Sequence, residues 1–416
     1  MPATGTSAST AAGGRPGLVR GLNLPLAVLF GLGVTIGAGI YVLIGATAAR
    51  AGMHAPLAFV LAAIVMLPTA ASFAELASRM PVSAGEAAYV QAGLGSPRLS
   101  LFVGLLVIAV GVISAAAISH GSAGYIQSLT GLPLPAIVPV VVLAMAGVAA
   151  WGIVESVTAA AIMTLIEIAG LVAIVVVGFG SSTAPLERLP EIWTGVSSVP
   201  VMAGIFSAAL LAFFAFIGFE GLANIAEEVK DPARTLPKAI FLTLIISTLL
   251  YILVVWVALV WVPREELGAS RAPLSLVFQR VTGLSPVLIS AIAVVATING
   301  IIAQMVMASR VIYGLADQGL LPAALAKVGE RTRTPLRATA LTAAVVLVLA
   351  VVFPLEGLAE MTSRLSLTVF ALVNAALYNL KRTGRGDPAP GYTVARWVPA
   401  VGCLLCVGLL IADALT

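Results

Sequence analysis

Eleven apolar stretches follow one another along the chain, separated by shorter segments that carry most of the charged residues. A helix needs about 20 mainly apolar residues to cross a bilayer. The pattern therefore predicts eleven transmembrane helices, of which the fourth, ninth and tenth are short. The predicted spans are Leu24–Ala48, Ala55–Phe73, Leu101–Ser122, Ile137–Trp151, Ser156–Gly178, Met202–Asn224, Ala239–Val262, Val287–Tyr313, Ala338–Phe353, Leu365–Leu380 and Val398–Leu415.

The composition indicates a polytopic membrane protein with an all-α fold. Of the 416 residues, 60% are hydrophobic and 10% are charged, whereas soluble domains carry roughly 25% charged residues. The apolar runs are longer than the alternating segments of barrel strands. Cys403 and Cys406 both fall in the last span, and we interpret them as packing residues. Because no basic tract with interleaved aromatic residues is present, no nucleic-acid partner is expected.

The positions of the positive charges predict the orientation. If the N-terminus is cytoplasmic, six of the 22 Lys and Arg residues lie outside and the other sixteen inside, as the positive-inside rule requires. We therefore predict a multi-pass protein of the cytoplasmic (inner) membrane, with residues 1–21 as a disordered cytoplasmic tail. The six outer residues are Arg50, Arg188, Arg264, Arg271, Arg280 and Arg364.

The first span contains a glycine-rich stretch from Gly31 to Gly45, GLGVTIGAGIYVLIG. Glycine weakens a helix interior by roughly 1 kcal/mol relative to alanine. A break inside the membrane is tolerated where it lines a cavity, and its free N–H groups then attract an anion. We expect such a break near Gly37–Gly39. The alternative is that Gly33 and Gly37 form a GxxxG pair that lets two helices pack closely.

The sixth span contains a second interruption, because Gly218 and Gly221 flank Phe219 and Glu220. An acidic side chain at membrane depth usually faces the bundle interior or water. Free amides at the first break would attract an anionic group, and free carbonyls near Phe214–Ile217 would attract a cationic group. A molecule that carries both groups a few ångströms apart is an α-amino acid, although other zwitterions also fit.

The two interruptions divide the chain into two comparable blocks of five spans, residues 22–180 and 201–380. An external loop at residues 181–200 joins the blocks, and residues 381–416 form a linker and the eleventh helix. Because five is odd, the second block enters the membrane from the opposite side, which gives an inverted repeat. Paired discontinuous helices in such a repeat mark the substrate site of a secondary transporter.

Four stretches of sequence resemble the amino acid–polyamine–organocation (APC) superfamily. They are TIGAGIY (Thr35–Tyr41), ELASRMPVSAGEAAYV (Glu75–Val90), FFAFIGFEGLANIAEEVKDPARTLPKAI (Phe213–Ile240) and ASRVIYGLADQGLLP (Ala308–Pro322). The third is similar to the bacterial and cationic-amino-acid-transporter-like branches. The resemblance implies a LeuT-type five-plus-five inverted repeat, here with one extra helix, and the activity of an amino acid permease.

The resemblance also implies roles for particular residues. Positions on the first helix that match the family motif would bind the substrate carboxylate through the backbone, and positions on the sixth would take its ammonium group. Phe214 would close over the substrate as a gate, and Glu220 would gate toward the cytoplasm. Alternatively, Phe214 is ordinary core and Glu220 only holds backbone amides together. The implied substrate-binding positions are Ile36, Gly37, Ala38, Gly39, Phe214, Ala215 and Ile217.

Glu167, in the middle of the fifth span, is the candidate proton carrier. A carboxyl buried without a cationic partner tends to be protonated near neutral pH. The resemblance implies that proton-coupled relatives have a lysine at the matching position. Because this chain has a glutamate there, their lysine mechanism does not transfer. Sodium is disfavoured, because the eighth span has Thr297 and Ser309 around Asn299 but no adjacent pair of hydroxyls. The alternatives for Glu167 are a structural hydrogen bond and a substrate contact.

The sequence therefore predicts a secondary-active amino acid transporter that works by alternating access, couples to protons and favours neutral substrates. The alternatives are an exchanger, or a polyamine or cationic amino acid permease without proton coupling; a channel or a membrane enzyme is more distant. His54 and His120 lie in different segments without carboxylates at ligand spacing, so no catalytic residue, metal or cofactor is expected. The expected partners are the amino acid and the lipid bilayer, and the oligomeric state stays open.

Overall fold

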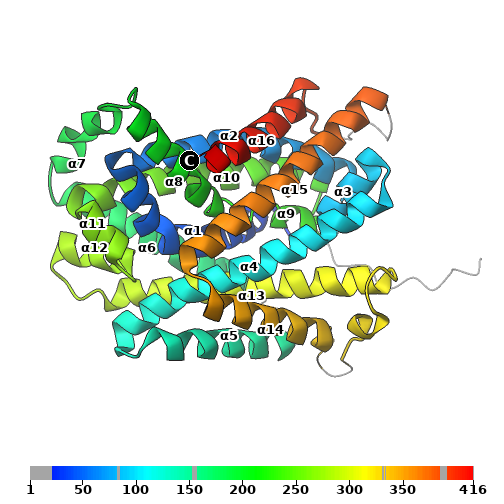
Figure 1. Cartoon of the computed structure of the whole chain (residues 1–416), viewed down its shortest axis with the longest axis horizontal. Helices are drawn as coiled ribbons and strands as arrows, with labels where there is room; N and C mark the ends of the chain where they lie inside the picture. Colours follow the sequence, from blue (N-terminus) through cyan, green and yellow to red (C-terminus); the bar gives the residue numbers. More distant parts are fainter. Residues whose placement is uncertain are drawn as a thin grey trace, which may run out of the picture.

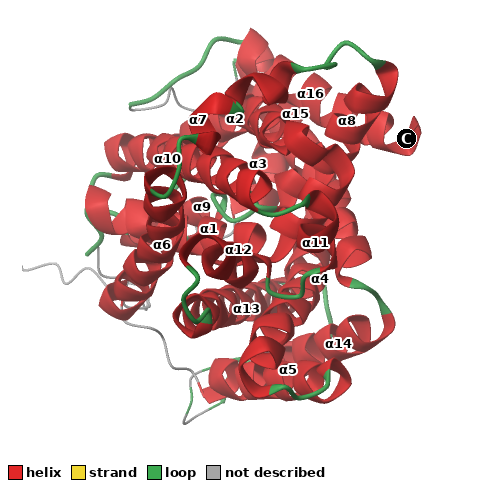
Figure 2. Cartoon of the chain, turned by 90° about the vertical axis from the view of Figure 1, so that its left-hand side faces the viewer, coloured by secondary structure: helices red, strands yellow, loops and turns green. Residues whose placement is uncertain are grey.

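The computed structural model describes residues 21–81, 85–151, 157–329, 332, 334–384 and 391–415. The predicted tail at residues 1–21 therefore lies outside the described residues, apart from Gly21. Helices joined by loops make up the described chain (Figures 1 and 2). The α-helices are α1 (Leu24–Ala51), α2 (Ala55–Arg79), α3 (Gly85–Leu94), α4 (Pro97–Thr130), α5 (Leu134–Trp151), α6 (Val157–Gly180), α7 (Ala184–Glu187), α8 (Val199–Phe214), α9 (Gly221–Asn224), α10 (Pro232–Trp261), α11 (Arg264–Ala269), α12 (Pro273–Thr282), α13 (Val287–Asp317), α14 (Leu336–Val352), α15 (Leu355–Thr383) and α16 (Trp397–Leu415). The 3₁₀ helices are η1 (Gly52–His54), η2 (Leu189–Trp193), η3 (Ala226–Glu228) and η4 (Ala323–Ala326).

Ten of the eleven predicted spans fall on one helix each within the described residues, the sixth falls on α8 and α9, and the all-α membrane fold is confirmed. Within the described residues, seven helical segments are long and apolar enough to cross a membrane, and shorter apolar helices accompany them. Helix α15 belongs to neither group. It carries charged residues at both ends of an apolar middle, and these lower its average hydropathy. The division into two inverted blocks stays a prediction.

Helix α1 lies in the middle of the bundle, where it packs against α6, α8, α10 and α13. Helix α4 packs along both α13 and α15. Many large apolar side chains on the outer helices are exposed, among them Val140 and Leu143 on α5. In a membrane protein such faces contact lipid, so the exposed apolar surface follows from the fold class.

The two ends of the bundle differ in their short helices. One end, which we call the α7 end, carries α7, α11 and α12 and lies at the left of Figure 1. The opposite end, which we call the α3 end, carries α3 and lies at the right of the same view. A parallel backbone bridge ties the start of α1 to the segment after α9, since the N–H of Leu22 donates to Glu228 O (3.0 Å) and that of Lys230 donates to Leu22 O (2.8 Å).

Candidate functional site

Helix α1 runs without interruption from Leu24 to Ala51, so the expected break near Gly37–Gly39 is wrong for this structure. Its glycines instead permit close packing. A Cβ at Gly33 would lie 2.2 Å from Thr164 Oγ1, and a Cβ at Gly39 would lie 2.2 Å from Ala215 Cα. The missing side chains let neighbouring helices approach the α1 backbone, which is the alternative that the GxxxG pattern offered.

The interruption of the sixth span is confirmed. Helix α8 ends at Phe214, α9 begins at Gly221, and the residues between them form turns. Gly218 has φ 132°, which favours glycine, and a Cβ there would lie 2.8 Å from the Val34 carbonyl of α1. The broken helix therefore depends on both the conformation and the small size of this residue.

The Glu220 carboxylate helps to hold this interruption. Its Oε2 accepts a hydrogen bond of 2.8 Å from the N–H of Gly218. The side chain is buried, so this bond satisfies a backbone donor that the helix break would otherwise leave without a partner. The contact agrees with the alternative in which Glu220 organises backbone amides. Its predicted part in gating stays a prediction.

The unbroken helix and the interrupted helix meet at Gly39 and Ala215, whose backbones are in direct contact. The Tyr251 hydroxyl of α10 joins them, at 2.9 Å from Thr35 O of α1 and 2.8 Å from Ala215 O. Ile36, Phe214 and Ile217 are also buried here, while the side chain of Ala38 lies outside what the structure describes. The predicted carboxylate and ammonium positions thus face one another across a closed contact. Their role in binding stays a prediction.

Glu167 lies beside this contact. It is fully buried on α6, and Asn299 of α13 donates from Nδ2 to its Oε1 over 3.3 Å. A Cβ at Gly37 would lie 3.3 Å from Glu167 Oε2, so the carboxylate rests against the glycine face of α1. The structure therefore brings the candidate proton carrier next to the predicted substrate positions.

Sequence reasoning missed three buried tyrosines that connect these helices. Tyr41 donates to Glu167 O over 2.7 Å, Tyr125 donates to Tyr41 O over 2.7 Å, and Tyr251 makes the contacts given above. A phenol inside an apolar span requires a hydrogen-bond partner. That requirement could have singled out these residues, although it could not have named the carbonyls that they reach.

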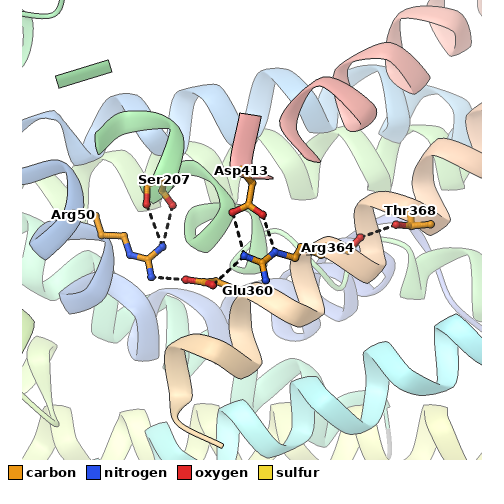
Figure 3. Close-up of polar contacts among 6 residues, drawn as sticks. All are labelled: Arg50, Ser207, Glu360, Arg364, Thr368 and Asp413. Carbon is orange, nitrogen blue, oxygen red and sulfur yellow. Dashed lines mark hydrogen bonds and ion pairs between the residues drawn. The ribbon is translucent and has the colours of Figure 1, made fainter. Parts of the chain in front are cut away.

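Ion pairs tie helices together at the α7 end. Figure 3 shows Arg50 of α1 facing Glu360 of α15, with which it pairs, and Ser207 of α8, whose carbonyl and hydroxyl it reaches over 3.3 Å. Arg364 lies between Glu360 (3.3 Å) and Asp413 of α16 (2.7 Å). The network joins α1, α8, α15 and α16 at the rim of the bundle.

A second ionic cluster lies at the α3 end and is more deeply buried. Glu75 Oε1 lies 2.5 Å from Arg79 Nη2 and 2.8 Å from Lys381 Nζ, and its Oε2 accepts from Val394 N over 2.8 Å. Glu75 is completely buried. A buried carboxylate needs such partners, so the cluster holds α2, α15 and the segment before α16 together.

An interrupted membrane helix beside buried polar groups is a feature found in secondary transporters. Among the described residues, no three His, Cys, Asp or Glu side chains are grouped so that they could hold a metal ion. The family model described as "Amino acid permease" matches residues 22–414. The chain therefore belongs to this amino acid permease family of the APC superfamily, and it is a transporter and not an enzyme.

Curated relatives agree with this family. The chain is 31% identical to the branched-chain amino acid permease BcaP of Bacillus subtilis, over 96% of this chain and 90% of that protein. It is 31% identical to the vacuolar cationic amino acid transporter 2 of Arabidopsis thaliana, over 88% of this chain and 60% of that protein. It is 29% identical to the methylthioribose transporter of Bacillus subtilis, over 88% and 82% of the two chains.

Proposed function

We propose that this protein is a proton-coupled, secondary-active transporter of neutral amino acids in the cytoplasmic membrane. The observation that carries the proposal is the interrupted helix α8–α9, whose turn backbone packs directly on the glycine face of α1. Glu167 and Asn299 lie beside that contact. Backbone polarity and an ionisable group thus meet near the centre of the bundle, where transporters of this kind bind their substrates.

Substrate binding requires the closed contact at Gly39 and Ala215 to separate. The amides of residues 36–39 are engaged within α1 in this structure. Unwinding α1 there costs less than elsewhere, because each glycine weakens the helix by roughly 1 kcal/mol relative to alanine. The freed amides would take the substrate carboxylate, and the carbonyls at the end of α8 would take the ammonium group.

Access from either side would alternate by opening one ionic network at a time. The Arg50–Glu360 network closes the α7 end, which we assign to the outside, and the Glu75 cluster closes the α3 end, which we assign to the cytoplasm. This assignment places the N-terminus in the cytoplasm, as the distribution of positive charge predicts.

A neutral, branched substrate fits the relatives and the pocket residues together. BcaP of Bacillus subtilis is named for branched-chain amino acids. Asn299, which lies beside the predicted site and donates to Glu167, is uncharged, as are the buried polar residues Ser114 of α4 and Gln304 of α13. The plant relatives named as cationic amino acid transporters supply the second candidate, a cationic substrate. A thermal-shift screen of the twenty amino acids and common polyamines on purified protein separates the two, and we expect leucine, isoleucine or valine to stabilise it most.

The test of coupling is Glu167→Gln in proteoliposomes. The amide keeps the size of the side chain and cannot carry the proton, so uptake driven by a pH gradient should be lost while exchange of labelled for unlabelled substrate persists. Glu356→Gln, at an exposed carboxylate of α15, is the matched control and should behave like the wild type. If Glu167→Gln still accumulates substrate in response to the pH gradient, Glu167 is not the proton carrier.

A further inference from the structure

A small cavity lies beside the helix interruption, between α3, α4, α13 and α15. Two carboxylates and one hydroxyl line it, together with apolar side chains of the surrounding helices. The cavity lies outside the contact of Gly39 with Ala215, and it shares with the candidate site only Glu220, which also accepts a hydrogen bond from Gly218 N. Its lining includes Glu86, Glu220, Ser366, Val107, Met307 and Phe370.

The two carboxylates come from different parts of the chain and are both buried. Glu86 lies in the first turn of α3 and is 4% exposed, and Glu220 lies in the turn before α9 and is 6% exposed. Within the described ranges, none of the ion pairs formed by Lys or Arg includes either carboxylate. Two acids facing one apolar cavity without such a cation cannot both ionise at low cost.

Ser366 provides the independent sign of a ligand. Its side chain is 2% exposed and lines the same cavity, and its Oγ makes no hydrogen bond to any described residue. A buried hydroxyl without a partner costs about 1–3 kcal/mol. A group that both donates and accepts, such as a protonated carboxyl, would remove this cost.

The other titratable group near Glu86 stays neutral. Burial raises the pKa of Glu86 to about 7, and burial also raises the pKa of the Tyr89 phenol on α3, with the Glu86 charge adding to it. Helices α4, α13 and α15 present Val107, Met307 and Phe370 to the cavity, which carry no charge. Glu220 is therefore the other acidic group that lines this cavity.

We propose that Glu86, Glu220 and Ser366 form a proton-binding site in which the two carboxyls share a single proton. One carboxyl oxygen carries the proton and hydrogen-bonds to the opposite carboxylate, and release transfers that proton to water at the α3 end. Ser366, whose Oγ has no partner among the described residues, would complete the site by donating to the oxygen that stays ionised once the proton is bound. The role of this site in transport rests on the proposed function. A proton that crosses the membrane with the substrate would leave the protein from this site.

Infrared pH titration of the carboxyl C=O band tests the shared proton in purified full-length protein. In the wild type, one proton should bind to the pair of Glu86 and Glu220, and a second proton should bind only at lower pH. In Glu220→Gln, Glu86 loses the ionised neighbour that makes protonation favourable, so its proton affinity should fall at least tenfold. Glu86→Gln should show the same fall for the remaining acid, since coupling between two sites is reciprocal. Unchanged titration of the remaining acid in both variants would overturn the proposal.

Three further variants test whether the coupled titration depends on these particular side chains. Glu86→Asp keeps a carboxyl and should retain the coupled titration, whereas Ser366→Ala should lower the affinity for the shared proton severalfold. Glu356 is exposed, so Glu356→Gln should leave the band unchanged. Substrate counterflow, measured on the same preparations, reports the transporter function separately. A coupled titration without counterflow would refute the proposed function, and counterflow without coupled titration would refute this site.

Discussion

Two glycine-rich membrane helices behave differently in this protein. Helix α1 keeps its helical backbone through Gly33, Gly37 and Gly39, whereas the sixth span is interrupted between Phe214 and Gly221. The difference lies in what each glycine does. Those of α1 make room for neighbouring helices, while Gly218 adopts φ 132° and its N–H is capped by the Glu220 carboxylate. Glycine content alone therefore does not break a membrane helix. The break also requires a glycine in a conformation that other residues disfavour and a side chain that accepts a hydrogen bond from the freed backbone N–H.

Gly218→Ala should have the largest effect. An Ala at φ 132° costs about 1–3 kcal/mol for the backbone, and the contact at 2.8 Å with Val34 O adds about 1–3 kcal/mol of overpacking. We expect loss of transport and a clear fall in the thermal midpoint. Gly221→Ala is the matched control from the same interruption, because its Cβ would lie 3.8 Å from the nearest atom. Equal effects of the two substitutions would contradict the special role of Gly218.

Gly39→Ala should come next. Its Cβ would lie 2.2 Å from Ala215 Cα, a backbone atom that cannot rotate away, so α1 and the interrupted helix must separate. Overpacking of this kind costs about 1–3 kcal/mol, and we expect transport to fall at least tenfold. The exposed helical Gly147→Ala has open space for its methyl group and should be neutral or slightly stabilising. Normal transport by Gly39→Ala would mean that transport does not depend on the close contact between Gly39 and Ala215.

Tyr251→Phe should have a smaller effect. The substitution removes the hydroxyl that reaches Thr35 O and Ala215 O, and an unsatisfied buried acceptor costs about 1–3 kcal/mol. The protein should fold, with a lower thermal midpoint and a severalfold change in the exchange rate. Tyr378→Phe, at a partly exposed tyrosine of α15, is the control. If both variants match the wild type, Tyr251 does not hold the two helices together.

The sequence was sufficient for features that depend on local composition. Apolar length located the spans, and Gly218 and Gly221, which flank Phe219 and Glu220, marked the interrupted helix. Features that depend on packing could not be predicted in this way. The Tyr251–Thr35 contact joins residues 216 positions apart, and Glu75 meets Lys381 across most of the chain. Whether the glycines of α1 unwind or pack is decided by the neighbouring helices, which no local pattern specifies.

The central claim is that one zwitterion bridges α1 and the interrupted helix by both of its charged ends. Calorimetric binding to purified protein tests this claim with the amino acid that stabilises it most, the methyl ester of that amino acid, and the amine that lacks the carboxylate. Hydrogen bonds to charged groups contribute about 1.5–3 kcal/mol, so each altered compound should bind at least tenfold more weakly. Equal binding of either compound would contradict the claim.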